Sequence, residues 1–146
     1  MEDRIGRKVA LTAKALRESF EARLAEAGTT LPTFVILEQL ASRDGLSQRE
    51  LAEAVHIEAP TLTRHLDRLD AEGLVRRRPD RADRRVTRVE LTEAGRRHHK
   101  EVVQVVDGLE ARLRRLLSER ELATFSRVLD RLHAHVQLLA ADDRAS

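Results

Sequence analysis

Apolar residues recur every three or four positions along most of the chain, which is the period of a helix with one apolar face. This spacing predicts a helix over residues 5–27 and a second over 32–43. The second segment leaves little polar face, so we expect it to be a buried central helix. A short helix is predicted next, carrying Leu51, Ala52 and Val55.

Capping residues mark where several helices begin. Ser47 and Glu50 have the spacing of a capping box, in which each side chain accepts a hydrogen bond from the other residue's amide. The same motif recurs at Ser118, and Thr92 is expected to be an N-cap. Long amphipathic helices are therefore predicted after Thr92 and after Ser118. The tail over 140–146 has no apolar pattern and is expected to fray.

A further helix is predicted between Ile57 and Gly73, and its two faces differ. Its apolar stripe consists of Ala59, Leu62, Leu66 and Leu69. Away from that stripe lie Pro60, Thr61, Arg64 and Arg68, with Thr63 and His65 on the flanks. Because Arg can donate two hydrogen bonds to guanine and Thr offers a hydroxyl or a methyl, this face suits a DNA major groove. Taken alone, the helix is more typical of an ordinary solvated surface.

A two-stranded ribbon is predicted after Gly73, which we expect to be a left-handed C-cap. Leu74 and Val75 lead into an arginine-rich segment that continues through the loop 80–85. Over residues 86–91 the two faces alternate as in a strand. Since a short helix, a tight turn and an amphipathic helix precede this ribbon, the sequence predicts a winged helix-turn-helix.

The charge of the chain is segregated. Residues 73–100 hold ten Lys and Arg against four Asp and Glu, a net of +6, whereas the whole chain carries +2 and the other residues therefore carry −4. A basic arm on an otherwise mildly acidic protein is the electrostatic pattern of a nucleic-acid binder. Trp and Tyr are absent, so stacking on single-stranded bases would rest on three Phe residues or a His, and double-stranded DNA is favoured.

These motifs resemble those of the MarR (multiple antibiotic resistance regulator) family of bacterial transcription regulators. The matching elements are Thr61-x-Thr63-Arg64, Leu69 with Gly73-Leu74-Val75, Asp80-x-x-Asp83-Arg84-Arg85 and Leu91-Thr92-x-x-Gly95. The resemblance extends over essentially the whole chain. It implies a mainly α fold with a β-wing and a helical dimerisation domain, and a non-enzymatic, sequence-specific regulator, most often a repressor. Arg81 stands where many members have proline, which is expected to loosen the wing tip.

The outward helix face and the resemblance together give a set of candidate DNA contacts. Thr61, Thr63 and Arg64 are expected at base edges in the major groove, and Arg84 and Arg85 in a narrow A·T-rich minor groove. By resemblance, Asp83 orients Arg85 without touching DNA. The other candidates, near the DNA backbone or along the same surfaces, are Ser47, Gln48, Pro60, His65, Arg68, Arg76 and Arg81.

The terminal helices predict association of two chains. Within one chain their apolar stripes cover each other only in part, so we expect a homodimer in which residues 1–30 and 92–146 interlock and residues 31–91 bind DNA. Such a dimer would read half-sites about 34 Å apart on a pseudo-palindromic operator. A monomer with a self-contained three-helix pack is the alternative.

The resemblance also implies a small effector, often aromatic or phenolic, bound between the dimer helices and the DNA-binding lobe. Candidate lining residues are Leu16, Phe20, Phe34 and Leu37, although their apolar character alone favours plain core. The six His residues lack dense metal-ligand spacing, so no metal or cofactor is expected, with a ligand set from distant segments as the alternative. No phosphate loop, nucleophile elbow or paired carboxylates occur, so no enzymatic activity is predicted.

Composition sets the remaining bounds. A chain of 146 residues that is 41% hydrophobic suffices for one compact domain. The absence of Cys excludes disulfides and cysteine redox sensing. No run of about 20 apolar residues and no apolar signal region occurs, so a cytoplasmic location without membrane contact is expected. Some winged helices are protein-interaction modules that do not contact DNA, an alternative that the basic arm disfavours.

Overall fold

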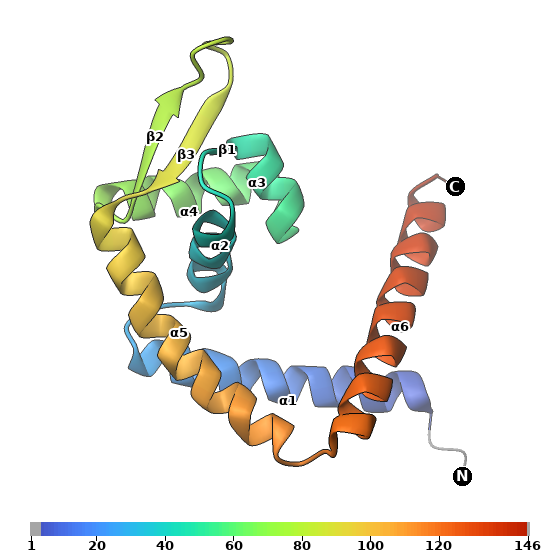
Figure 1. Ribbon diagram of the computed structural model, residues 1–146. Coiled ribbons are helices and arrows are strands. Elements are labelled where there is room, and N and C mark those ends of the chain that lie inside the picture. The colour runs from blue at the N-terminus through green and yellow to red at the C-terminus, as the bar shows by residue number, and fades with distance from the viewer. Residues whose placement is uncertain (1–3, 146) are drawn as a thin grey trace. The chain divides into compact units, whose positions relative to one another are not determined.

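The computed structural model describes residues 4–145, with side chains described through residue 139. Residues 4–145 form a mainly helical fold with a small antiparallel sheet, as predicted (Figure 1). The chain divides into two compact units, Met1–Asp107 and Gly108–Ser146. The elements in chain order are α1 (Ile5–Glu26), α2 (Leu31–Ser42), β1 (Leu46–Ser47), α3 (Gln48–Val55), α4 (Ala59–Ala71), β2 (Val75–Pro79), β3 (Thr87–Leu91), α5 (Glu93–Arg114) and α6 (Glu119–Ala145).

The core of the first unit is built around α2. Ile36, Leu37 and Leu40 of this helix are fully buried, so the prediction of a buried central helix is confirmed. Helices α3 and α4 and the three strands complete the same cluster with Leu46, Leu51, Val55, Leu62, Leu66, Leu69, Val75, Val89 and Leu91. Because one cluster joins these elements, the helix-turn-helix and the base of the wing share a single core.

The predicted capping residues are confirmed. Ser47 Oγ accepts from the Glu50 amide at 3.1 Å, and Glu50 Oε2 accepts from the Ser47 amide at 2.7 Å, which together form a capping box at the start of α3. Gly73 has a φ of 72° just after α4, a conformation that glycine adopts without steric cost. Pro60 lies in the first turn of α4, where an amide has no partner within the helix, so proline loses no hydrogen bond there.

The wing is part of a three-stranded antiparallel sheet with the order β1-β3-β2. Strand β2 pairs with β3 so that Val75 lies opposite Leu91 and Arg77 opposite Val89. The two-stranded ribbon was predicted, but β1 was not. A strand of two residues, Leu46–Ser47, is too short to show an alternating pattern, and only its pairing with β3 reveals it.

The start of α5 is fastened to the winged lobe. Thr92 Oγ1 accepts from the Gly95 amide at 3.0 Å, which confirms the predicted N-cap, and donates to the Gly73 carbonyl at 2.6 Å. Arg96 forms an ion pair with Asp44 at 2.5 Å. The first turns of α5 are therefore held to the end of α4 and to the turn before β1.

The boundary between the two compact units differs from the predicted domain division. We predicted that residues 1–30 and 92–146 form one dimerisation part. In the structure, α1 and α5 as far as Asp107 belong to the same unit as the winged lobe, and Leu24 and Val102 are buried within it. The predicted division into a dimerisation part and a DNA-binding part describes two associated chains, whereas these units describe one chain, so that division stays a prediction.

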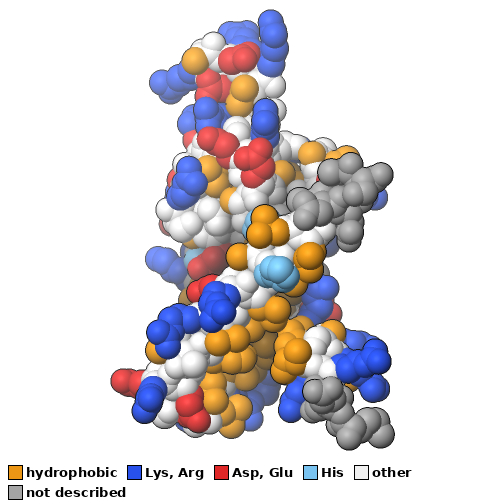
Figure 2. Space-filling model, turned by 90° about the vertical axis from the view of Figure 1, so that its right-hand side faces the viewer, with side chains coloured by type: hydrophobic (Ala, Val, Ile, Leu, Met, Phe, Trp, Pro, Cys, Tyr) orange, Lys and Arg blue, Asp and Glu red, His pale blue; other side chains and the backbone are white. Residues whose placement is uncertain are grey.

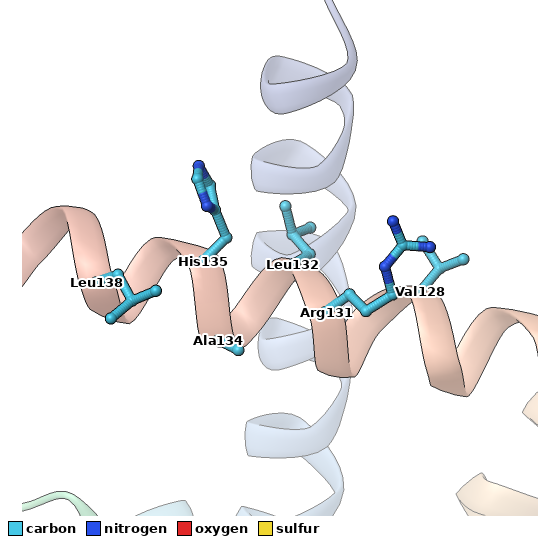
Figure 3. A pocket seen from close by; sticks show the side chains of 6 residues that line it. All are labelled: Val128, Arg131, Leu132, Ala134, His135 and Leu138. Atoms are coloured by element: carbon cyan, nitrogen blue, oxygen red, sulfur yellow. The ribbon is translucent and has the colours of Figure 1, made fainter.

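Helix α6 carries an exposed apolar face. Its first turn is fixed by the predicted capping box, in which Glu121 Oε2 accepts from the Ser118 amide at 2.8 Å. Phe125 is 53% exposed and Val136 52%, and a shallow depression of about 610 Å³ on this helix is lined by α6 side chains, among them Leu132 (Figure 3). An apolar face of this extent is typical of a helix that associates with another surface.

The C-terminal tail was predicted incorrectly. We expected residues 140–146 to fray, but α6 continues to Ala145, and residue 146 lies outside the described residues. The segment is rich in Ala, the strongest helix former, and extending an existing helix needs no apolar face.

Within residues 4–145, no helix has the length and apolar content needed to cross a membrane.

Two glycines of α5 test how closely the start of this helix packs against Leu74. A Cβ at position 95 would lie 1.9 Å from the Leu74 carbonyl oxygen, so Gly95→Ala should lower the free energy of unfolding by about 1–3 kcal/mol despite the better helix propensity of Ala. A Cβ at position 108 would have no atom within 4 Å, so Gly108→Ala should raise the free energy of unfolding by about 0.5–1 kcal/mol. Urea unfolding at one protein concentration measures both free energies. A Gly95→Ala variant as stable as the wild type would contradict the close contact between Gly95 and Leu74.

Candidate nucleic-acid interface

Helix α4 presents one side to solvent because its other side is buried. Leu62, Leu66 and Leu69 are fully buried, and this apolar stripe places Pro60 and Arg64 outward, where both are exposed. Thr61, Thr63 and His65 are partly exposed at the borders of that face. The structure thus brings together the predicted major-groove residues on one helix face of the size that enters a major groove.

Thr63 is held in place by the helix before it. Its Oγ1 accepts from Gln48 Nε2 at 2.7 Å and donates to the Ala59 carbonyl at 3.0 Å. The Gln48–Thr63 hydrogen bond ties the first residue of α3 to the first turns of α4. With its hydroxyl engaged in this way, Thr63 has its methyl group for contact with a base.

His65 lies between two arginines of the same helix. Burial lowers the pKa of His65, and the positive charges of Arg68 and Arg64 lower it further. A neutral imidazole at pH 7 is therefore favoured, and it keeps one donor and one acceptor for hydrogen bonding.

Arg68 and Ser47 are placed differently from the other candidate contacts. Arg68 Nη2 donates to Thr33 Oγ1 at 2.8 Å, and Arg68 Nε lies 3.7 Å from a carboxylate oxygen of Glu72. Ser47 is only 8% exposed and caps α3 with its hydroxyl. The Ser47 side chain is enclosed in the lobe, so the structure gives no support to a DNA contact from it. The Arg68 side chain is 49% exposed, and its contact with DNA stays a prediction.

Asp80 organises the turn at the wing tip. Its Oδ1 accepts from the amides of Ala82 and Asp83 at 2.8 and 3.1 Å, and its Oδ2 accepts from Arg88 Nε at 2.6 Å. The hydrogen bond from Arg88, followed by those from the two amides, lowers the pKa of Asp80 to about 2. Arg88 also lies 3.2 Å from Glu50, so it connects the wing to the capping box of α3.

Asp83 shapes the backbone next to Arg85. Its Oδ1 accepts from the Arg85 amide at 3.0 Å, and its carbonyl accepts from the Val86 amide at 2.9 Å. The carboxylate therefore acts on the main chain at Arg85 rather than on the guanidinium. This contact is consistent with the orienting role predicted for Asp83.

The arginines of the basic arm fall into two groups. Within the described residues, Arg81, Arg84 and Arg85 are exposed and belong to none of the ion pairs. Arg76 and Arg78 pair with Glu90, and Arg77 pairs with Asp67 and Asp70. Figure 2 shows Lys and Arg side chains over the upper part of the molecule with carboxylates among them. Three unpaired positive charges are thus gathered at the wing tip, and Arg97 and Lys100 of α5 are likewise exposed and belong to none of the ion pairs of the described residues.

Sequence reasoning missed Asp80 and Arg88 as site residues. Asp80 carried a readable signal, since an Asp at the start of a loop commonly accepts from the amide two residues on. The pairing of Arg88 with Glu50 joins residues 38 apart in the chain, and no local pattern reveals it.

The four predicted effector residues lie in different surroundings. Leu37 is fully buried in the core of the lobe, whereas Leu16 is 37% exposed. Phe34 stacks on His99 with ring centroids 6.4 Å apart, and Phe20 is partly exposed. Among the side chains described, those of residues 4–139, no group of three His, Asp or Glu is placed to hold a metal ion.

The fold is a winged helix-turn-helix with an outward Thr/Arg face and a cationic wing tip. These features place the chain in the class of DNA-binding winged-helix proteins. A model of the MarR family matches residues 29–87. The fold is similar to that of an Escherichia coli MarR mutant complexed with operator DNA, with 26% identity, 88% of this chain and 92% of that chain covered, and a TM-score of 0.80. It is also similar to PcaV of Streptomyces coelicolor in complex with its natural ligand, with 25% identity, coverage of 84% and 89%, and a TM-score of 0.76.

The fold is shared with the MepR–DNA complex of S. aureus as well, at 23% identity, coverage of 92% and 99%, and a TM-score of 0.84. Residues 29–87 thus match the MarR family of transcriptional regulators, which is not a family of enzymes, and the fold is similar to that of a MarR protein determined with operator DNA. The resemblance found in the sequence is confirmed.

The role of Asp80 can be tested through pH. Because its pKa in the folded chain lies below the ordinary value of 3.8, its contribution to stability is present above that pH and is lost as the pH falls toward about 2. Asp80→Asn should therefore flatten the fall in unfolding free energy between about pH 5 and pH 2. An exposed carboxylate, Asp107→Asn, serves as the control. Equal slopes for Asp80→Asn and the wild type would contradict the assignment.

Proposed function

We propose that this chain is a homodimeric, ligand-responsive repressor of transcription that acts in the cytoplasm and binds a pseudo-palindromic operator. The observation that carries the proposal is the position of Arg81, Arg84 and Arg85, exposed and unpaired at the wing tip, on the lobe that presents the outer face of α4. Three unpaired positive charges gathered on one lobe suit a polyanionic partner such as the DNA backbone.

In the proposed complex, α4 reads bases in the major groove. Arg64 donates to guanine O6 and N7, and Thr61 and Thr63 offer a hydroxyl and a methyl to neighbouring base edges. Pro60, which is exposed in the first turn of α4, and His65, at the border of its outer face, lie close to the DNA backbone. Gln48 supports this face through its hydrogen bond to Thr63.

The wing contributes charge rather than base readout. Arg84 and Arg85, with Arg81 beside them, reach a minor groove where a narrow A·T-rich segment concentrates negative potential. Arg76 is 69% exposed while it lies 3.6 Å from Glu90, so it remains open to a phosphate. These contacts fix the register of the protein on the duplex.

The dimer rests on the apolar face of α6. Phe125, Leu129, Leu132 and Val136 recur three or four residues apart on this helix, and each is 39% or more exposed. Burial of this face against a second chain removes apolar area from water and gives two recognition helices for two half-sites. A half-site spacing of about 34 Å then follows from the pitch of DNA.

A small effector is proposed from what similar proteins bind. PcaV of S. coelicolor was determined with its natural ligand, and the structure of BpsR of Bordetella bronchiseptica, which has the same fold, is described with regulation of DNA binding by 6-hydroxynicotinic acid. Such a ligand acts only through different affinities for the DNA-bound and free forms of the dimer.

The DNA contacts are tested with two arginine variants. Arg64→Ala should cost about 1–3 kcal/mol on the preferred duplex and relax specificity at one base pair. Arg85→Ala should weaken binding to all duplexes alike and reduce the slope of log K against log salt by about 1. Fluorescence anisotropy over a salt series measures both, with Arg120→Ala on α6 as the control. Unchanged affinity in both variants would refute the proposed contacts.

The dimer is tested with two substitutions on opposite sides of α6. Leu132 and Ala134 project to opposite sides of the helix in Figure 3. Leu132→Glu places a charge in the apolar face and should yield monomers, because an unpaired charge is costly to bury. Ala134→Glu adds the same group elsewhere and should leave the dimer intact. Sedimentation equilibrium distinguishes the species, and a dimeric Leu132→Glu variant would place the interface elsewhere.

A further inference from the structure

The hydroxyl of Thr63 is held from two sides by the protein. Its oxygen accepts a hydrogen bond from Gln48 Nε2 at 2.7 Å, and its hydrogen is donated to the Ala59 carbonyl at 3.0 Å. The two partners lie in different elements, since Ala59 is the first residue of α4 and Gln48 is the first residue of α3. The direction of the Thr63 hydroxyl is therefore fixed by the packing of two helices as well as by its own helix.

This arrangement leaves the Thr63 hydroxyl without a hydrogen to donate to DNA. A Thr hydroxyl has one O–H hydrogen and two lone pairs. The Ala59 carbonyl takes the hydrogen, and Gln48 takes one lone pair of an oxygen that both partners hold toward the protein. Guanine O6 and N7, adenine N7 and thymine O4 are all acceptors in the major groove, so this hydroxyl has nothing to offer them. The group that Thr63 offers a base is its methyl.

Gln48 fixes the place of that methyl group. A Thr inside a helix divides between two χ1 rotamers, and its methyl changes place between them, whereas a Val is held almost entirely to one rotamer. The hydrogen bond from Gln48 favours the rotamer in which Oγ1 faces α3. Gln48 is half-buried, and its backbone is fixed by the capping box of Ser47 and Glu50. A rigid neighbour thus selects one position for the methyl of Thr63.

We propose that Thr63 recognises a thymine through the 5-methyl group of that base, and that Gln48 is the positioning residue that keeps the Thr63 methyl in place for this contact. The inference deepens the proposed function and rests on it, because it concerns the outer face of α4 in a major groove. Thymine is the base that carries a methyl group at this edge, and contact between two methyl groups removes apolar area from water.

The proposal gives Gln48 a different role from a contact with the DNA backbone. A residue that contacts a phosphate weakens binding to every sequence alike when it is removed, because phosphates carry no sequence information. A residue that positions the Thr63 methyl changes the preference for thymine at one base pair. The two roles therefore differ in a ratio of affinities that can be measured.

The methyl contact is tested with deoxyuridine, which differs from deoxythymidine only in lacking the 5-methyl group. The duplex is one that the full chain enriches from randomised DNA, and each thymine is replaced in turn. At one position in each half-site, the wild type should bind the deoxyuridine duplex about three- to fivefold more weakly, the value of about one buried methyl group. Competition followed by fluorescence anisotropy measures this ratio.

Two variants of Thr63 assign the effect to its methyl group. Thr63→Ser keeps the hydroxyl but lacks the methyl, so it should bind the thymine and deoxyuridine duplexes equally at that position. Thr63→Val keeps a methyl in one rotamer and should retain the preference for thymine. A preference that persists in Thr63→Ser, or a wild type that shows no such position, would overturn the thymine contact.

A variant of Gln48 tests the positioning role. Gln48→Ala should reduce the preference for thymine to less than about twofold, and the double variant Gln48→Ala/Thr63→Val should restore it, because valine needs no hydrogen bond to hold its rotamer. Arg49→Ala is the control on the same helix, since Arg49 pairs with Glu53 of α3 at 3.2 Å. If Gln48→Ala weakens binding to both duplexes by the same factor, the positioning role is overturned.

The selection step separates this inference from the proposed function. If no specific duplex is enriched, the proposed function fails, and the thymine contact fails with it. If a specific duplex is bound and none of its thymine methyl groups depends on Thr63, the proposed function stands and the thymine contact alone is overturned.

Discussion

The burial of the leucine stripe of α4 is the constraint on which the interface depends. Leu62, Leu66 and Leu69 have no exposed surface, and each fully buried Leu contributes about 1.5–3 kcal/mol relative to an exposed one. A rotation of the helix about its axis would expose these side chains, so the orientation of α4 is fixed by packing. The side that carries Pro60 and Arg64 therefore faces solvent as a consequence of the core.

Polar contacts extend this fixed orientation to the wing. Arg88 lies between Asp80 at the wing tip and Glu50 in the capping box of α3, so one guanidinium joins the wing to α3, the helix that supports α4 through the Gln48–Thr63 hydrogen bond. Arg77 connects β2 to Asp67 and Asp70 of α4 in the same way. These carboxylates neutralise arginines that hold the structure together, and Arg81, Arg84 and Arg85 at the tip are left unpaired for a partner.

The sequence predicted what local patterns determine, and long-range contacts supplied the rest. Helix periods and caps such as Ser47 with Glu50 depend on neighbours within four residues, so the main elements and the outward side of α4 could be derived. Strand β1 and the hydrogen bond from Arg68 to Thr33, 35 residues away, depend on tertiary packing. Arg68 was therefore assigned to the DNA-facing surface, although in the structure it contacts α2. The helical tail after residue 139 was missed because helix propagation does not require apolar spacing.

The central claim is that the outer face of α4 and the wing tip together read duplex DNA as a two-fold dimer. The most direct measurement is selection of bound duplexes from randomised DNA, followed by the affinity and stoichiometry of the enriched sequences over a range of salt concentrations. The account predicts an enriched pseudo-palindrome bound by one dimer, with half-sites about 34 Å apart and affinity that falls steeply with salt. Weak and equal binding to every duplex would contradict it and would favour a protein-interaction module.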